Sequence, residues 1–368
     1  MTEFKCKRLG DIANVFTGKC NAEDAVENGK YPLFDRSGEI KKSNQYFADC
    51  EAIIVPGEST TFVPRYYKGK FNLHQRAYCI NPNDSEVNGL FLYYLIKANS
   101  SYFFSVATGA TVASLRLNNF LRMKVNLPPR RIQDKIANIL STYDKLIENN
   151  NKRIAILEKE AEELYKEWFV RKHIMARERF EFTKKKLREI AIECGNPVKA
   201  KNRNNFNHYL PINCIPSKSM CLIEEDNINN AESSLISFES FNILFGAMRP
   251  YFHKVLLAPF DGVTRTTCFV IKPIEREYLY FLYLTLFQKV TVDFATTISV
   301  GSTMPYVRWI DFSRLVVNVP DVSIIKSFNK IIEPIIKETV NFYFINNNLN
   351  KQRDYLLPRL MSGKLEVM

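Results

Sequence analysis

Residues 132–168 read IQDKIANILSTYDKLIENNNKRIAILEKEAEELYKEW, and this stretch decides the architecture that the rest of the chain must fit. Apolar side chains recur in it at steps of three and four residues, and glutamate and lysine crowd the other positions. This pattern, sustained over several heptads, predicts a helix that packs against a second long helix. With about 37 residues the helix would be roughly 55 Å long, which is more than the width of a small domain. The expected seam consists of Ile136, Leu140, Tyr143, Ile147, Ile154, Leu157, Leu164 and Trp168, with Asn150 as a polar member that can fix the register.

A second, less regular seam lies between residues 328 and 360. Thr339, Asn346 and Arg353 interrupt it. Pro334 predicts a kink or a late start of this helix, because proline cannot complete the helical hydrogen-bond pattern. Two such helices can bury their seams against each other, and antiparallel pairing would place a globular domain at each end. The apolar members of the second seam include Phe342, Leu349, Leu356 and Leu360.

The sequence that precedes one helix is repeated before the other. KRLGDIA at residues 7–13 returns as KKLREIA at 185–191. AYCINP at 77–82 returns as CFVIKP at 268–273, and TGAT at 108–111 returns as VGST at 300–303. Both copies then lead into an apolar strand and a proline, and matches in the same order favour two related domains over chance. We therefore expect an α+β fold with two repeated α/β domains (1–128 and 185–320), two long helices that form an antiparallel coiled coil (129–172 and 321–368) and a linker (173–184).

The chain is basic, and its cysteines are scattered. It has 51 lysines and arginines against 39 aspartates and glutamates, which gives a formal net charge of +12. An excess of this size favours a polyanionic partner, and nucleic acid is the commonest one. The eight cysteines form no Cys-x-x-Cys pair, the four histidines do not lie at zinc spacing, and the first ten residues do not resemble a secretion signal. We expect a cytoplasmic protein with reduced thiols, no metal site and no membrane span.

Small polar and basic side chains on turns are the candidates for DNA contact. Lysines and hydroxyl groups suit phosphates, while arginine and glutamine can read base edges through paired hydrogen bonds. Each candidate is alternatively a solvated loop residue without such a role. In the first domain the candidates are Arg36, Ser37, Lys41, Lys42, Ser59, Thr60, Thr61, Arg65, His74, Gln75, Arg76 and Thr111. In the second domain they are Arg249, Tyr251, Lys254, Arg265, Thr266 and Thr303, with Arg249 and Arg265 as the best guanine readers.

Motifs of enzymes that act on nucleic acids are missing. The sequence contains no P-loop, no Gly-x-Gly-x-x-Gly and no Asn-Pro-Pro-aromatic motif of adenine methyltransferases. A nuclease-like set of Asp24, Glu39 and Lys41 can be assembled, but a Glu-x-Lys triplet is common by chance and no proline precedes the aspartate. We therefore expect no catalytic residues, although an enzyme with an unrecognised active site is an alternative that an assay of the pure chain would test.

The motifs that flank the helices resemble those of a known family. NLPP at 126–129 leads into the first helix, IANIL follows at 136–140, and LYKEWF at 164–169 ends it. The second copy closes with LLPRLMSG at 356–363, whereas PDVS at 320–323 lacks the double proline of the first copy. In this order the motifs are similar to those of the specificity subunit of type I restriction–modification enzymes, over nearly the whole chain.

The resemblance implies a function. Each repeat would be a target recognition domain followed by a long helix, and the chain would read a bipartite, asymmetric DNA site without being catalytic. Two modification (methyltransferase) subunits and a restriction subunit would bind to it, and those partners would hold S-adenosylmethionine, ATP and magnesium. A coiled-coil scaffold without a DNA role is the alternative, which the net charge disfavours and a gel shift at moderate salt would distinguish.

Overall fold

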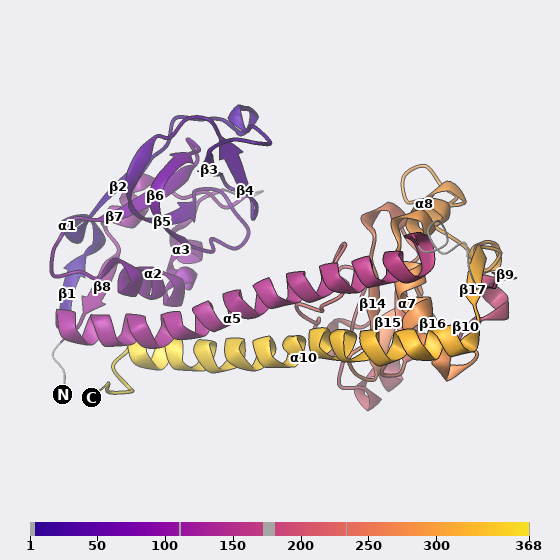
Figure 1. Cartoon of the computed structure of the whole chain (residues 1–368). Helices are drawn as coiled ribbons and strands as arrows, with labels where there is room; N and C mark the ends of the chain where they lie inside the picture. Colours follow the sequence, from indigo (N-terminus) through magenta and orange to yellow (C-terminus); the bar gives the residue numbers. More distant parts are fainter. Residues whose placement is uncertain (1–3, 110–111, 172–180, 233, 368) are drawn as a thin grey trace. The chain divides into compact units, whose positions relative to one another are not determined.

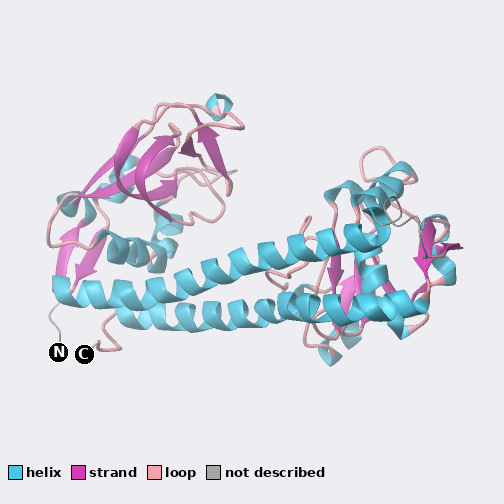
Figure 2. Ribbon diagram, in the orientation of Figure 1, coloured by secondary structure: helices cyan, strands magenta, loops and turns pink. Residues whose placement is uncertain are grey.

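The computed structural model describes residues 4–109, 112–171, 181–232 and 234–367. The chain divides into two compact units, residues 1–146 with 350–368 and residues 147–349, and each is taken by itself below. Each unit holds sheets, short helices and part of the two long helices α5 (Arg130–Tyr165) and α10 (Val322–Met361) (Figures 1 and 2). The expected α+β fold with two long helices is confirmed.

The first unit is built on a six-stranded sheet with the order β2-β7-β5-β6-β3-β4. Side chains of β5 alternate between two cores, because successive residues of a strand point to opposite faces. Ile53 and Val55 pack in the core that includes helix α2, whereas Ala52 and Ile54 pack in the core on the other face. The strands are β2 (Ala13–Thr17), β3 (Tyr31–Phe34), β4 (Ile40–Ser43), β5 (Ala48–Pro56), β6 (Arg65–Leu73) and β7 (Ala77–Pro82).

The first domain enters and leaves through a strand pair of its own. β1 (Lys5–Arg8) runs antiparallel to β8 (Lys124–Leu127), after which α5 begins at Arg130. The short helices are α1 (Leu9–Ile12), α2 (Gly89–Ala98), α3 (Ser100–Val106) and α4 (Leu117–Leu121). The Tyr94 hydroxyl of α2 donates a 2.5 Å hydrogen bond to Asp144 of α5, so the domain is attached to the long helix by a polar contact as well as by its core.

The second unit repeats this plan with smaller sheets. Strands β10 (Ala191–Glu193), β16 (Cys268–Pro273), β13 (Ile243–Gly246) and β14 (Val255–Leu257) form one sheet in the order β10-β16-β13-β14. Strands β11 (Asn196–Val198), β12 (Leu235–Phe238) and β15 (Gly262–Arg265) form another. The strand pair β9 (Phe182–Lys186) and β17 (Val316–Pro320) corresponds to β1 and β8, and α7 (Leu279–Phe287), α8 (Lys289–Thr297) and α9 (Trp309–Phe312) correspond to α2, α3 and α4.

The two long helices pack against each other in opposite directions within each unit (Figure 1). In the first unit, Ile136 and Leu140 of α5 share a core with Leu360 of α10. In the second, Ala161 of α5 shares a core with Phe328 of α10. The early part of α5 therefore meets the late part of α10 and the reverse, as in an antiparallel coiled coil.

Polar residues interrupt the packed seam and pair with each other. The Asn150 amide is buried and donates a 2.8 Å hydrogen bond to the Asn346 Oδ1, and the Asn346 amide donates to Asn151 at 3.0 Å. In the first unit Arg353 forms a 2.6 Å ion pair with Asp144. Since a buried amide pair is satisfied only in one alignment, these contacts select the register of the two helices.

The seam differs in places from the one expected. Ile136, Leu140, Ile154, Phe342 and Leu360 are buried. Tyr143, Ile147, Leu157, Leu164, Trp168, Leu349 and Leu356 are only half-buried, while Tyr165 and Phe169 lie inside the core instead of their neighbours. A straight helix has 3.6 residues per turn and drifts from a strict heptad, and the last turns of this helix, Lys166–Arg171, adopt the wider π form, so the buried face moves by one residue.

One expectation and one boundary also differ. Of the kink or late start expected from Pro334, the late start is wrong, because α10 begins at Val322, one residue from the expected 321, and is helical through Pro334. Pro334 lies on the exposed face between the buried Ile332 and Ile336, where the missing hydrogen bond is tolerated. The expected linker at 173–184 overlaps residues 172–180, which lie outside the described chain, and its last residues belong to β9, which begins at Phe182.

Candidate nucleic-acid interface

Each domain brings three segments together at the end of its central strand. In the first domain they are residues 57–61 after β5, residues 74–76 before β7 and residues 108–109 and 112–115 before α4, and we call this set the first junction. The Gly57 N–H donates to the Arg76 carbonyl at 2.8 Å, and the Leu115 N–H donates to the Gly57 carbonyl at 2.7 Å. These backbone hydrogen bonds thus fix the positions from which the loop side chains project.

The second domain contains the same frame. Its junction comprises residues 247–249, 265–267 and 300–307. The Ala247 N–H donates to Thr267 at 2.9 Å, and the Val307 N–H donates to Ala247 at 3.0 Å. Gly109 and Gly301 open the last loop of each junction with φ of 119° and 111°, a conformation that side chains rarely adopt. The repeat in the sequence is therefore also a repeat of hydrogen bonds.

Two predicted residues of the first domain, Arg36 and Arg76, bind the carboxylate of Glu58, and a third, Gln75, precedes Arg76 in the sequence. Arg36 and Arg76 both bind Glu58, with 2.7 Å between the Arg36 Nη1 and Oε2 and 2.8 Å between the Arg76 Nη1 and Oε1. Gln75 is exposed and donates to the Asn21 side chain at 2.6 Å. Ser59, Thr60 and Thr61 lie beside this cluster in the first junction, Lys42 is exposed on β4, and Thr111 lies outside the described residues.

Four other candidates in the first domain have partners inside the domain. The Arg65 guanidinium donates to the Ser37 carbonyl. The Ser37 hydroxyl donates to Asp35 at 2.6 Å, and Lys41 forms a 2.8 Å ion pair with the same buried carboxylate. His74 is buried and accepts the Arg76 N–H at Nδ1, and burial lowers the pKa of its imidazole, which keeps it neutral near pH 7. These groups hold turns in place because their partners are inside the domain.

Most candidates of the second domain converge. The Arg249 guanidinium donates to the Thr303 carbonyl at 3.3 Å, and the Tyr306 hydroxyl donates to the Thr266 carbonyl at 3.3 Å. Arg265 is exposed at the end of β15, and Thr266 follows it on the next turn. The second junction therefore gathers Arg249, Arg265, Thr266 and Thr303 on one set of loops.

Arg249 has an unusual backbone. Its φ is 49°, in the left-handed region, and its N–H donates to Pro305 at 2.7 Å, which holds the strain. Among the described residues its buried Nε has no hydrogen-bond partner. Tyr251 follows on the same short turn and is 48% exposed, with its ring 4.8 Å from that of Phe252.

The ammonium group of Lys254, another candidate of the second domain, is bound by backbone carbonyls of its own domain. Its ammonium group donates to the carbonyl oxygens of Ile212 at 2.8 Å, Asn213 at 3.3 Å and Ile215 at 2.6 Å. Burial lowers the pKa of this group. Three carbonyl acceptors match the three N–H donors of an ammonium group, so Lys254 closes a turn of the domain.

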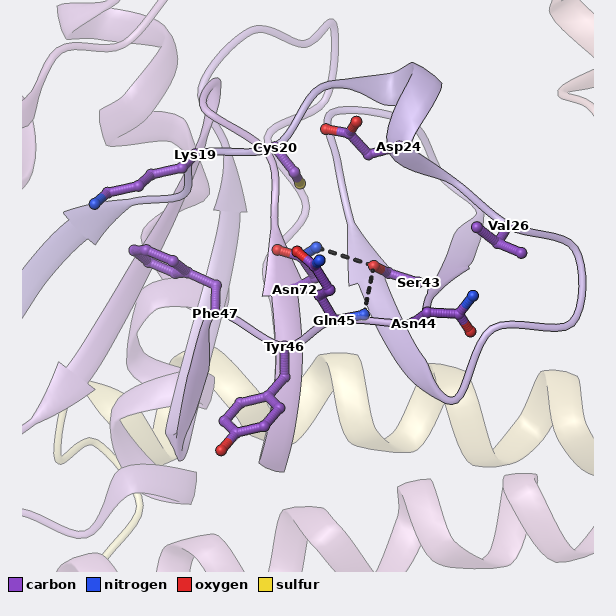
Figure 3. A pocket seen from close by; sticks show the side chains of 10 residues that line it. All are labelled: Lys19, Cys20, Asp24, Val26, Ser43, Asn44, Gln45, Tyr46, Phe47 and Asn72. Atoms are coloured by element: carbon purple, nitrogen blue, oxygen red, sulfur yellow. Dashed lines mark hydrogen bonds between the residues drawn. The ribbon is translucent and has the colours of Figure 1, made fainter.

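A hollow of about 480 Å³ on the first domain was not foreseen from the sequence (Figure 3). Tyr46 and Phe47 are 47% and 37% exposed at its edge, with the Lys70 ammonium 4.8 Å from the centre of the Tyr46 ring. Asn72 donates to the Ser43 hydroxyl at 3.1 Å within it. Exposed aromatic rings next to lysines are surfaces on which bases stack, so the hollow extends the candidate interface.

Other kinds of site were sought in the described part of the chain. No group of three or more histidine, cysteine, aspartate or glutamate side chains there could hold a metal ion. No described helix is long and apolar enough to cross a bilayer. All eight cysteines are free thiols, and burial raises the pKa of Cys221 to about 12.

The architecture defines a class of proteins with two similar α+β domains joined to a pair of antiparallel helices. Residues 1–159 match the family model of the type I restriction modification DNA specificity domain. The type I restriction enzyme MjaIX specificity subunit of Methanocaldococcus jannaschii is 27% identical, over 93% of this chain and 85% of that protein. The EcoDI specificity subunit of Escherichia coli is 24% identical, over 86% and 78%.

A solved structure supports the fold. The S subunit of a type I restriction–modification system from M. genitalium superposes with a TM-score of 0.66 at 17% identity, over 100% of this chain and 97% of that one. The first 159 residues thus match the DNA specificity domain of type I restriction modification, and most of the chain is similar to specificity subunits of type I restriction enzymes.

Proposed function

We propose that this chain reads a bipartite, asymmetric DNA site, with one half-site for each domain, and positions partner subunits on it. The observation that carries the proposal is the pair of junctions, which share a hydrogen-bonded frame but present different side chains. Ser59 occupies the position of Arg249, and Gln75 that of Thr266. A common frame with unlike polar groups suits two domains that contact DNA in the same way and recognise different bases.

Residues that are the same in the two domains suit contacts to the phosphate backbone, which is the part of DNA that does not vary with sequence. Arg116 and Arg308 each follow the last loop of a junction by the same number of residues, and both are exposed. Arg308 pairs with Asp311 at 2.6 Å, an exposed contact that a phosphate can replace. We assign these two arginines to sequence-independent phosphate contacts, together with the overall charge of +12.

The partners in this proposal are double-stranded DNA, two modification (methyltransferase) subunits and a restriction subunit. Exposed apolar side chains on the long helices support docking of other subunits, for example Ile156 at 65% and Phe344 at 43% exposure. S-adenosylmethionine, ATP and magnesium would be bound by those subunits and not by this chain. The complex acts on DNA, so the proposal places the chain in the cytoplasm.

Mapping the methylated positions in the DNA of a host that expresses the chain with its methyltransferase tests the proposal. We expect one asymmetric sequence with two short conserved blocks around unread base pairs. Methylation at a single continuous block, or with no common sequence, would rule out the bipartite assignment.

Replacing Arg249 with alanine should loosen recognition of one half-site only. Loss of a bidentate guanine contact costs roughly 1–3 kcal/mol of discrimination. Competition binding with duplexes altered in either half-site measures this. Equal weakening on every duplex, accompanied by a lower melting temperature, would show that the arginine serves the fold through its contact to Thr303.

The purified chain should neither methylate nor cut DNA, because its sequence carries no P-loop or adenine-methyltransferase motif and no group of three or more acidic, histidine or cysteine side chains among its described residues could hold a metal ion. The assay supplies S-adenosylmethionine, ATP and magnesium with a DNA that carries the mapped site. Adding the methyltransferase subunits should restore methyl transfer. Methyl transfer by the chain alone would contradict the assignment.

A further inference from the structure

Three segments of the first domain meet at the carboxylate of Glu58. Arg36 approaches it from the turn after β3, and Arg76 approaches from the turn before β7. The Arg36 Nη1 lies 2.7 Å from Oε2, and the Arg76 Nη1 lies 2.8 Å from Oε1 and 2.9 Å from Oε2. Three charge-assisted hydrogen bonds thus converge on one carboxylate, and the bond from Arg76 is the main reason why the pKa of Glu58 lies below its ordinary value.

The ion pairs of Glu58 with Arg36 and Arg76 are not what holds these segments together, because their backbones are fixed by other contacts. Glu58 forms a β-bridge with Ser114, and the Gly57 N–H donates to the Arg76 carbonyl at 2.8 Å. On the other side, the Ser37 N–H donates to the Asp35 carboxylate at 2.7 Å and closes the turn that carries Arg36. The arginine side chains are what Glu58 adds to this frame.

Stability does not account for the carboxylate. Both arginine side chains are 55% exposed and Glu58 is 20% exposed, and ion pairs at such exposure contribute little to folding. A negative charge on a surface that binds DNA also repels phosphates and weakens binding to every sequence. The loss of DNA affinity that the Glu58 carboxylate causes must therefore be offset by another contribution to DNA recognition.

That contribution to recognition is the orientation of Arg36 and Arg76. A guanidinium group reads guanine through two parallel N–H donors, which requires a fixed plane, and a free arginine side chain has many rotamers. Glu58 engages one terminal nitrogen of each group, and a guanidinium has five N–H donors, so others remain for a base. The carboxylate also relieves the repulsion between two adjacent positive charges.

We propose that Glu58 determines specificity in the first domain: it orients Arg36 and Arg76 as paired base readers and, through its own charge, weakens binding to all other DNA. The inference rests on the proposed function. Met248 takes the position of Glu58 in the second junction, where it bridges Tyr306 as Glu58 bridges Ser114. The orientation of two arginines by a carboxylate is therefore expected at one half-site only.

The test compares Glu58→Gln with the wild-type chain, each in complex with the methyltransferase subunits. Dissociation constants are measured at fixed salt for the full site, for duplexes scrambled in one or the other half-site, and for an unrelated duplex. We expect discrimination at the half-site not affected by Arg249→Ala to fall roughly tenfold, and affinity for the unrelated duplex to rise a few-fold. Discrimination at the other half-site should not change.

Two further variants separate orientation from other effects. Glu39→Gln removes an exposed carboxylate near the same turn and should raise affinity for all duplexes without loss of discrimination. Adding Arg76→Gln to Glu58→Gln should cost little more discrimination than either change alone. Unchanged discrimination in Glu58→Gln, or equal weakening on every duplex, would overturn the role of Glu58, whereas a wild-type complex without sequence preference would overturn the proposed function as well.

Discussion

DNA binding by the complex should weaken on the order of a thousandfold when salt rises from 50 to 200 mM, if about six phosphates are neutralised. The basis is the net charge of +12 and the exposed arginines of both junctions. Titration of a labelled duplex at several salt concentrations gives the slope of log K against log salt.

The share contributed by this chain can be isolated with Arg116→Ala and Arg308→Ala. Each change should reduce the salt slope by about one and weaken all sequences alike. The matched controls are Arg122→Ala and Arg314→Ala, exposed arginines that stand six residues later in each domain. A flat salt profile, or equal effects of both pairs, would contradict the assignment.

Lengthening both long helices by four residues should preserve both half-sites and add one or two unread base pairs between them. Four residues add about 6 Å and close to one helical turn, and DNA rises 3.4 Å per base pair. The insertions belong after Leu146 in α5 and after Leu349 in α10, where the two compact units divide. There they leave the Asn150–Asn346 pair and the Asp144–Arg353 pair intact within their own units.

Two inserted residues in each helix are the control. They rotate the following apolar face by roughly 200°, so we expect loss of folding or of assembly with the methyltransferase instead of a new spacing. Methylome sequencing reads the result for both variants. If the four-residue variant methylates the original sequence with its original spacer, the helices do not set the distance between half-sites.

The long helices could be predicted because their pattern is local. The spacing of Ile136, Leu140 and Ile154 records which face is buried, whatever it packs against. The pattern was less informative near Trp168, because helical drift and the π-helical turns bury Phe169 in the core in its place. It was also less informative at Pro334, which lies on an exposed face and does not delay the start of α10.

The DNA candidates were harder to predict, because the role of a polar side chain depends on partners that are distant in sequence. Lys254 binds carbonyl groups about 40 residues away, and His74 is buried. Glu58 was overlooked because only the fold brings it to Arg36 and Arg76, 22 and 18 residues distant. The sequence did carry one signal for it: Glu58 is the single acid among residues 57–61, directly before the predicted Ser59, Thr60 and Thr61.

The strand pairs β1·β8 and β9·β17 mean that each domain is a cassette. Lys5 pairs with Leu127 in the first and Phe182 with Pro320 in the second, so the chain enters and leaves each domain at neighbouring points. A segment whose ends lie together can be exchanged for a homologous one without disturbing the helices. If each domain reads one half-site, as proposed above, recombination at these strands would give new combinations of half-sites from existing parts.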